Sequence, residues 1–214
     1  VFDSLPYAGG TMLIGVPAFR LPREAIEMDV RLIERLGVEF VYNTQIGVDI
    51  TFEQLQKDYD AVAITAGAMN AVELDVPGGD LEGVQYGVDF MKKANLGEPV
   101  EPGNDVVIIG GGYTAMDCSR TSLRHGASNV AIVYRRTRSE LVVDEEELGE
   151  TEREGVRMEF LASPVELDVF ADDDDALAWE PASSCWSGEL HFLAAPVLGD
   201  LILSRVPVRA KDSR

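Results

Sequence analysis

The pattern of hydrophobic positions predicts one βαβ unit in the middle of the chain. The four consecutive β-branched residues 106–109 are typical of a strand buried in a parallel sheet. A glycine-rich turn follows them, and the next apolar run, residues 129–134, predicts a neighbouring strand. Between the two strands we expect a helix from about Thr114 to Gly126, because glycine readily adopts the left-handed backbone that ends a helix.

The N-terminal part of the chain shows further elements. Pro22 predicts the start of a helix with one apolar face, and Gly37 its end. Residues 5–22 predict an apolar loop that contains several glycines and prolines. We expect a short strand at residues 38–42 and a buried strand at residues 60–68.

Two elements are expected after the βαβ unit. The acid-rich residues 144–154 predict a helix that presents a solvated face. Residues 156–161 predict another strand. Strands that alternate with helices in this way indicate an α/β fold with a parallel sheet.

The turn between the first strand and helix of the βαβ unit has the chemistry of a phosphate site. Gly110 permits the tight turn, and Gly112 lets the backbone approach a pyrophosphate because it has no Cβ. Ala115 is small enough for the helix to pack close to the strand. The helix N-terminus would then hold the phosphates, so we predict a dinucleotide-binding turn.

The residues that follow the second strand favour NADP(H) over NAD(H). An NAD-binding fold usually has an acidic residue there, which binds the 2′-hydroxyl of the ribose. This chain has Arg135 and Arg136 instead, with Arg138 close by. A guanidinium group matches the oxygens of a 2′-phosphate and neutralises its charge. The alternative is that these two arginines only solvate the end of a strand.

Composition narrows the possible partners. The formal net charge of −20 argues against nucleic acid, whose phosphates a strongly acidic protein repels. No run approaches the roughly 20 apolar residues that a membrane-spanning helix needs, and no signal peptide is visible. We therefore expect a cytoplasmic protein that does not act in a membrane. Its abundant acids and few lysines also predict adaptation to high salt.

The cysteines and histidines suggest no metal or redox centre. The two cysteines, Cys118 and Cys185, form no C-x-x-C motif, so neither a redox disulfide nor an iron–sulfur or zinc site is expected from this chain alone. Cys118 is expected to pack as a small apolar residue. We assign no catalytic residue and no metal ligand.

Taken together, these segments resemble the small (β) subunit of NADPH-dependent glutamate synthase and its relatives, including the reductase part of dihydropyrimidine dehydrogenase. The resemblance extends from Val1 to about Asp168. Its motifs, in chain order, are the Gly9-Gly10 loop, residues 16–22 (VPAFRLP), 36–40 (LGVEF), 43–47 (NTQIG), 59–62 (YDAV), 110–118 (GGGYTAMDC) and 134–138 (YRRTR). Many motifs in one order are far more specific than the glycine turn alone.

The resemblance implies two cofactors, FAD and NADP(H), and a role for individual residues. Asp3 would bind the ribose of FAD. The flavin would be lined by Gly9, Gly10, Thr11 and Arg20, and Ile46 and Gly67 would lie close to it. The pyrophosphate of NADP(H) would be bound by the turn, which consists of Gly110, Gly111, Gly112, Tyr113 and Thr114. Its 2′-phosphate would be bound by Arg135 and Arg136. The cofactors would carry the chemistry and the protein would align them.

Three features of the sequence depart from the pattern of the family. Asp3 stands where Glu is usual, and Tyr113 stands where Asn or Asp is usual. The sequence Thr65-Ala66-Gly67 replaces the usual Ala-Thr-Gly. The first FAD-binding glycine turn, the cysteine-rich domain and the return to the FAD domain are not recognisable in this sequence.

We therefore expect a truncated α/β fold of the two-dinucleotide-binding (FAD/NAD(P)-binding, Rossmann-like) type. A partial FAD-binding domain would span residues 1–100, an NADP-binding Rossmann domain would span residues 103–168, and residues 169–214 would form an acidic tail of uncertain structure. The FAD would take a hydride from NADPH and pass electrons to iron–sulfur clusters in a missing domain or a partner, such as a glutamate synthase large subunit. The alternatives are a stand-alone NADPH–ferredoxin-type reductase and a catalytically silent module that binds NADP(H).

Overall fold

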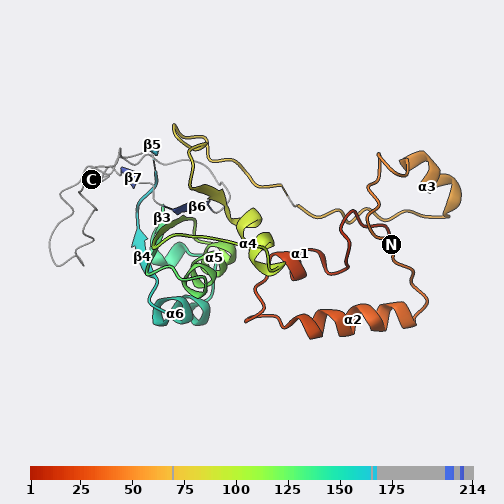
Figure 1. The fold of residues 1–214 in the computed structure, drawn as a ribbon, viewed down its shortest axis with the longest axis horizontal. Helices are drawn as coiled ribbons and strands as arrows, with labels where there is room; N and C mark the ends of the chain where they lie inside the picture. Colours follow the sequence, from red (N-terminus) through yellow and green to blue (C-terminus); the bar gives the residue numbers. More distant parts are fainter. Residues whose placement is uncertain (69, 165, 168–200, 205–207, 210–214) are drawn as a thin grey trace. The chain divides into compact units, whose positions relative to one another are not determined.

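A computed structural model describes residues 1–68, 70–164, 166–167, 201–204 and 208–209 (Figure 1). Cys185 and most of the expected acidic tail lie outside these residues. The chain forms two compact units. Unit 1 contains residues 1–70 and 91–98, and unit 2 contains residues 71–90 and 99–214. Unit 2 therefore also contains residues 71–90 and 99–102, whereas the Rossmann domain was expected to begin at residue 103.

Unit 2 is built on a five-stranded sheet with the order β1-β6-β2-β3-β4. Its strands are β1 (Val84–Tyr86), β2 (Asp105–Ile109), β3 (Asn129–Tyr134), β4 (Arg157–Phe160) and β6 (Leu201–Ser204). Strands β2, β3 and β4 are parallel, whereas β6 is antiparallel to both β1 and β2. The predicted βαβ unit and the strand after it are therefore confirmed, while β1 and β6 were not expected.

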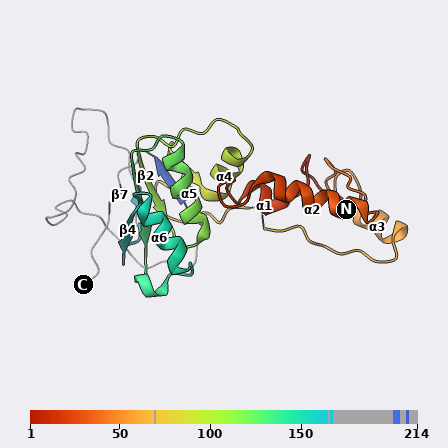
Figure 2. The ribbon, with the colours of Figure 1, turned by 90° about the horizontal axis from the view of Figure 1, so that it is seen from below.

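Helices α5 (Tyr113–Arg124) and α6 (Glu145–Arg153) connect the parallel strands and lie side by side on the sheet (Figures 1 and 2). The core beneath them contains Ile108 and Ile132 from the strands and Met116 from α5, all of which are fully buried.

A buried ion pair joins the two helices. The Arg120 guanidinium donates through Nη1 to Glu147 Oε1 over 2.9 Å and through Nη2 to Glu154 Oε1 over 2.7 Å. Arg124 also donates to Glu154, and the hydrogen bonds from Arg124 and Arg120 together lower the pKa of that carboxyl to about 2. The helix predicted at residues 144–154 forms and presents exposed acids such as Glu145 and Glu146, but Glu147 departs from the expected solvated face because it faces Arg120 and is buried.

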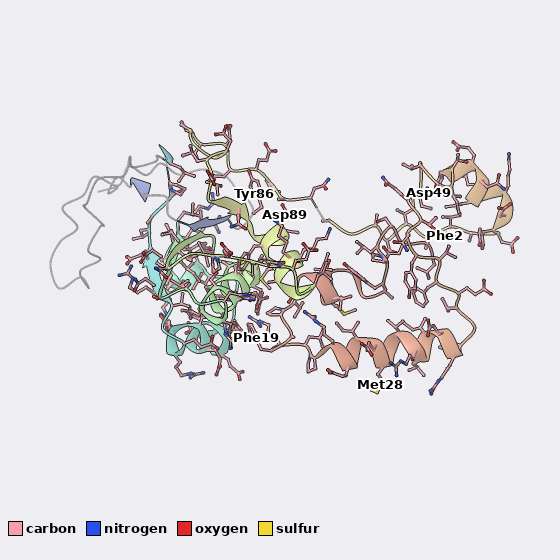
Figure 3. All side chains as sticks on the ribbon, viewed as in Figure 1. Phe2, Phe19, Met28, Asp49, Tyr86 and Asp89 are labelled. Carbon is pink, nitrogen blue, oxygen red and sulfur yellow. The ribbon has the colours of Figure 1, made fainter. Side chains whose placement is uncertain are left out.

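Several shorter elements complete unit 2. The short helix η1 (Arg138–Glu140) follows β3, and β5 (Glu166–Leu167) pairs with β7 (Val208–Arg209). Helix α4 (Gly87–Asn95) begins in unit 2 and ends in unit 1. Figure 3 marks Tyr86 at the end of β1 and Asp89 in the first turn of α4. Cys118 is buried on α5, as expected, and its Sγ lies 3.7 Å from the carbonyl oxygen of Gly87.

Unit 1 contains the helices α1 (Gly10–Ile14), α2 (Arg23–Arg35) and α3 (Phe52–Asp58). Helix α2 confirms the prediction from Pro22 and Gly37. Helix α1 lies in the segment that was expected to be a loop. Gly9, its N-cap, and Gly10, its first residue, both have positive φ.

The strands expected in unit 1 do not form. Residues 38–42 contribute only an isolated parallel bridge between Val41 and Phe2. Residues 60–68 are mostly exposed and have no strand partner among the described residues. An apolar parallel strand needs neighbouring strands and covered faces, and the described chain gives this segment neither.

Within the described residues, no helix has the length and apolar character needed to cross a membrane.

Candidate functional site

The glycine turn of unit 2 connects the end of β2 to α5. Gly110 has φ = +148°, a backbone conformation that favours glycine, and its N–H continues the β2–β3 ladder by donating to Val133 O over 3.0 Å. Gly111 is buried, and a Cβ at this position would collide with the ring of Tyr134 and lie 2.9 Å from Leu141 Cδ2. The absence of side chains at 110 and 111 is therefore required by the backbone and by packing.

The N-terminus of α5 has the properties of an anion site. Gly112 occupies the N-cap position and no side chain caps the helix there. The first turn of α5 contains no acidic residue. Tyr113 is 44% exposed and Thr114 is half-buried, so this end of the helix is open to a ligand. Uncapped N–H groups and the helix dipole both favour a phosphate at this position.

The arginines after β3 differ in their partners. Arg138 donates to Glu152 over 2.7 Å and lies 3.5 Å from Glu145, which places it in an ion-pair network with α6. In the described part of the chain, Arg135 and Arg136 make no side-chain hydrogen bond and no ion pair. Hydrogen bonds with Thr137 lower the pKa of Glu140, and the charge of Arg136 acts in the same direction as a smaller contribution. Arg135 and Arg136 directly follow Tyr134, whose ring packs on Gly111 of the turn, and within the described residues neither guanidinium is engaged in an ion pair.

The residues predicted to bind FAD all lie in unit 1. Asp3 follows the Phe2–Val41 bridge, and its Oδ1 accepts a hydrogen bond from the N–H of Leu5 over 2.9 Å. Gly9 has φ = +121° and precedes α1, which contains Gly10 and Thr11.

The other three residues of the predicted flavin site are distributed along unit 1. Arg20 is half-buried in a turn closed by its N–H to Pro17 O. Ile46 is 40% exposed and pairs with Ile50. Gly67 lies in the exposed segment 60–68. No hydrogen bond described in unit 1 brings Gly67 to Asp3 or to the Gly9 turn.

Sequence reasoning missed several residues that shape the site. Thr137 and Glu140 form a capping box in the loop after β3. The spacing Thr-x-x-Glu at residues 137–140 was a visible signal for it. Asp144 caps α6 by accepting from Glu147 N over 2.8 Å. Nothing in the sequence indicated that Tyr134 packs on the turn, because a residue's neighbours across a sheet are set by tertiary structure.

The parallel β2–α5–β3 unit, its glycine turn and the open helix N-terminus define a dinucleotide-binding α/β protein. The model of the pyridine nucleotide-disulphide oxidoreductase family matches residues 32–177. The chain therefore belongs to that family. The expected fold class is confirmed.

Curated relatives confirm the resemblance to the glutamate synthase small subunit. The chain is 42% identical over 170 residues to the β subunit of the NADP(+)-dependent formate dehydrogenase of Moorella thermoacetica, a match covering 78% of this chain and 24% of that protein. It is 39% identical over 176 residues to the glutamate synthase [NADPH] small chain of Halomonas elongata, covering 77% of this chain and 37% of that one. The chain thus spans well under half the length of these two relatives.

Among solved structures, the fold is similar to that of FprA from Mycobacterium tuberculosis in complex with NADPH. The TM-score is 0.67 at 21% identity, and the match covers 78% of this chain and 53% of FprA. At this identity the similarity concerns the fold.

Proposed function

We propose that this chain is the NADP(H)-binding part of an FAD-dependent oxidoreductase that takes a hydride from NADPH. One observation carries the proposal. The uncapped N-terminus of α5 lies after the glycine turn, and the adjacent strand β3 is followed by two arginines without ion-pair partners in the described chain. A helix N-terminus suits a pyrophosphate, and the arginines suit a 2′-phosphate.

The residues of unit 2 fit NADP(H) at two points. Backbone N–H groups at Gly112, Tyr113 and Thr114 would bind the pyrophosphate, since no side chain occupies the cap of α5. Arg135 and Arg136 would hold the 2′-phosphate by charge-assisted hydrogen bonds. FprA, which has a similar fold, is described as a complex with NADPH, and this supports the assignment.

The fit of unit 1 to FAD is partial. Asp3 lies at the end of a strand-like segment, as a ribose-binding acid would, but Gly67 and Ile46 are in exposed segments. When bound, a flavin supplies the ability to accept a hydride as a pair of electrons and to release the electrons singly.

The electron acceptor in this proposal is an iron–sulfur protein or domain, such as a glutamate synthase large subunit. The relatives at about 40% identity are named as a formate dehydrogenase subunit and as a glutamate synthase chain. These names support a common reductase part that serves different partners. A stand-alone NADPH–ferredoxin-type reductase shares both cofactors and differs only in its acceptor.

A catalytically silent NADP(H)-binding module is the second candidate function. It is favoured by one observation, the exposed segment 60–68, which carries Gly67 and has no strand partner in the described chain. Such a module would bind NADPH through unit 2 and retain no flavin.

The test of the NADP(H) site is the variant Arg135→Ala/Arg136→Ala, titrated with NADPH and with NADH. Each charge-assisted contact to the 2′-phosphate contributes roughly 1.5–3 kcal/mol, so NADPH affinity should fall at least 100-fold while NADH affinity stays nearly constant. Arg31→Ala/Arg153→Ala is the matched control, because it removes two exposed arginines elsewhere. An equal loss of both cofactors in the test variant contradicts the assignment.

The test of the flavin is the visible absorption spectrum of the chain in high salt, with and without added FAD. If the chain retains flavin absorbance, and NADPH bleaches it under anaerobic conditions, the result supports the proposed oxidoreductase. Tight NADPH binding with no retained flavin supports the silent module.

A further inference from the structure

The loop that carries the two arginines, residues 135–144, is attached to the glycine turn where it begins. The ring of Tyr134, the residue before the loop, fills the space beside Gly111. Leu141, inside the loop, packs against the same glycine. The Tyr134 hydroxyl also donates to the carbonyl oxygen of Glu140 over 2.9 Å, which ties the middle of the loop to the end of β3.

The loop is attached to the turn a second time where it ends. The hydroxyl of Tyr113, the first residue of α5, donates to Oδ2 of Asp144 over 2.8 Å. The other carboxylate oxygen of Asp144 caps α6. Hydrogen bonds from the Glu147 N–H and from Tyr113 lower the pKa of Asp144, so its carboxylate is charged at neutral pH and remains a strong acceptor.

Through this hydrogen bond, Tyr113 joins the start of α5 to Asp144, the N-cap of α6. Its backbone belongs to the proposed pyrophosphate site, while its side chain holds the far end of the arginine loop. A loop fixed at both ends has fewer conformations that keep its arginines away from the ligand, and this pre-organisation increases affinity.

We propose that Tyr113 is a positioning residue that, through its hydrogen bond to Asp144, holds the loop 135–144 against the glycine turn and so sets the preference for NADPH over NADH. The inference rests on the proposed NADP(H) site. It assigns the preference to a hydroxyl group and a carboxylate that would not touch the 2′-phosphate themselves.

The experiment measures the dissociation constants of NADPH and NADH for the full chain and for Tyr113→Phe, which removes only the hydroxyl. A hydrogen bond of this kind corresponds to a factor of about 3 to 10 in affinity. NADPH should weaken by that factor and NADH by less than about twofold. Adenosine 2′,5′-bisphosphate and 5′-AMP, which differ by the 2′-phosphate, should show the same difference. Tyr59→Phe is the control, because it removes an exposed tyrosine hydroxyl in unit 1.

A second variant, Asp144→Ser, keeps an N-cap for α6 but removes the acceptor for Tyr113. The double variant Tyr113→Phe/Asp144→Ser should show the same NADPH-to-NADH preference as whichever single variant loses more of it, because both substitutions remove the same hydrogen bond. A preference in Tyr113→Phe that equals that of the unchanged chain, or equal losses for both cofactors, overturns the inference. If the unchanged chain itself shows no preference for NADPH, the proposed function fails and the inference fails with it.

Discussion

The two units of this chain differ in how they bury apolar side chains. In unit 2, residues such as Ile108 and Ile132 are completely buried between the sheet and its helices. In unit 1, Met28 is 66% exposed and Ile64 is 74% exposed, and Figure 3 shows Met28 projecting from α2 into solvent. Most of the exposed large apolar side chains in the described chain lie in unit 1.

Two similar segments show why the units differ. Residues 106–109 and residues 60–68 are both largely apolar. Gly110 follows the first run, and Gly67 lies near the end of the second. The first run lies within β2 and has β3 on one side and β6 on the other. The second has no strand partner among the described residues. A strand sequence becomes a strand only where other strands satisfy its backbone N–H and C=O groups.

The largest expected difference between the units is in the free energy of unfolding after the same Ile→Ala substitution in each of them. Ile132→Ala should lower the free energy of unfolding by about 3 kcal/mol, because it leaves a cavity in a packed core. Ile64→Ala should change it by less than about 0.5 kcal/mol, because this side chain is mostly exposed. Urea denaturation followed by circular dichroism measures both changes. Equal losses in the two variants would mean that unit 1 has a packed core of its own.

A somewhat smaller effect is expected from the buried ion pair between α5 and α6. Arg120→Ala should cost about 2–3 kcal/mol, because it leaves the Glu147 carboxylate buried without its partner. Arg31→Ala is the matched control in unit 1, where Arg31 and Glu27 form an exposed pair worth under about 0.5 kcal/mol. A cost for Arg120→Ala no greater than that of the control would show that the pair contributes nothing to unit 2.

The smallest effect concerns pH. The Arg124 and Arg120 guanidinium groups lower the pKa of Glu154 from 4.5 to about 2. Because the pKa is lower in the folded state, the stabilisation is fully present above pH 4.5 and is lost as the pH falls towards 2. Glu154→Gln should therefore be less stable than the unchanged chain by about 1 kcal/mol at pH 7, allowing for solvent screening.

The check on this pH effect is the same pair of proteins unfolded in urea between pH 7 and pH 2. The difference in unfolding free energy should shrink below pH 4.5. Glu27→Gln, at an exposed pair in unit 1, should differ little from the unchanged chain across the range. A Glu154→Gln difference that stays constant down to pH 2 would mean that the carboxylate charge is not what stabilises unit 2.

Local signals allowed much of unit 2 and several helix ends to be predicted. The β2–α5–β3 unit followed from two apolar runs and three glycines, and α2 from Pro22 and Gly37. Thr51 caps α3 by accepting from Gln54 N over 3.1 Å, in the Thr-x-x-Gln spacing that is typical of a helix start. The arginines after β3 were visible as a pair, whereas their lack of ion-pair partners in the described chain was not.

The sequence by itself thus determined the glycine turn between β2 and α5, because glycines, small residues and flanking apolar runs act over a few neighbouring positions. Only the tertiary structure decided which segments became strands. It inserted β6 between β1 and β2, about a hundred residues from either along the chain. It also joined Tyr113 to Asp144 and Arg120 to Glu147, pairs that no spacing rule connects. Backbone pairing and side-chain contacts of this kind depend on which distant segments the folded chain brings together, and that information is not local.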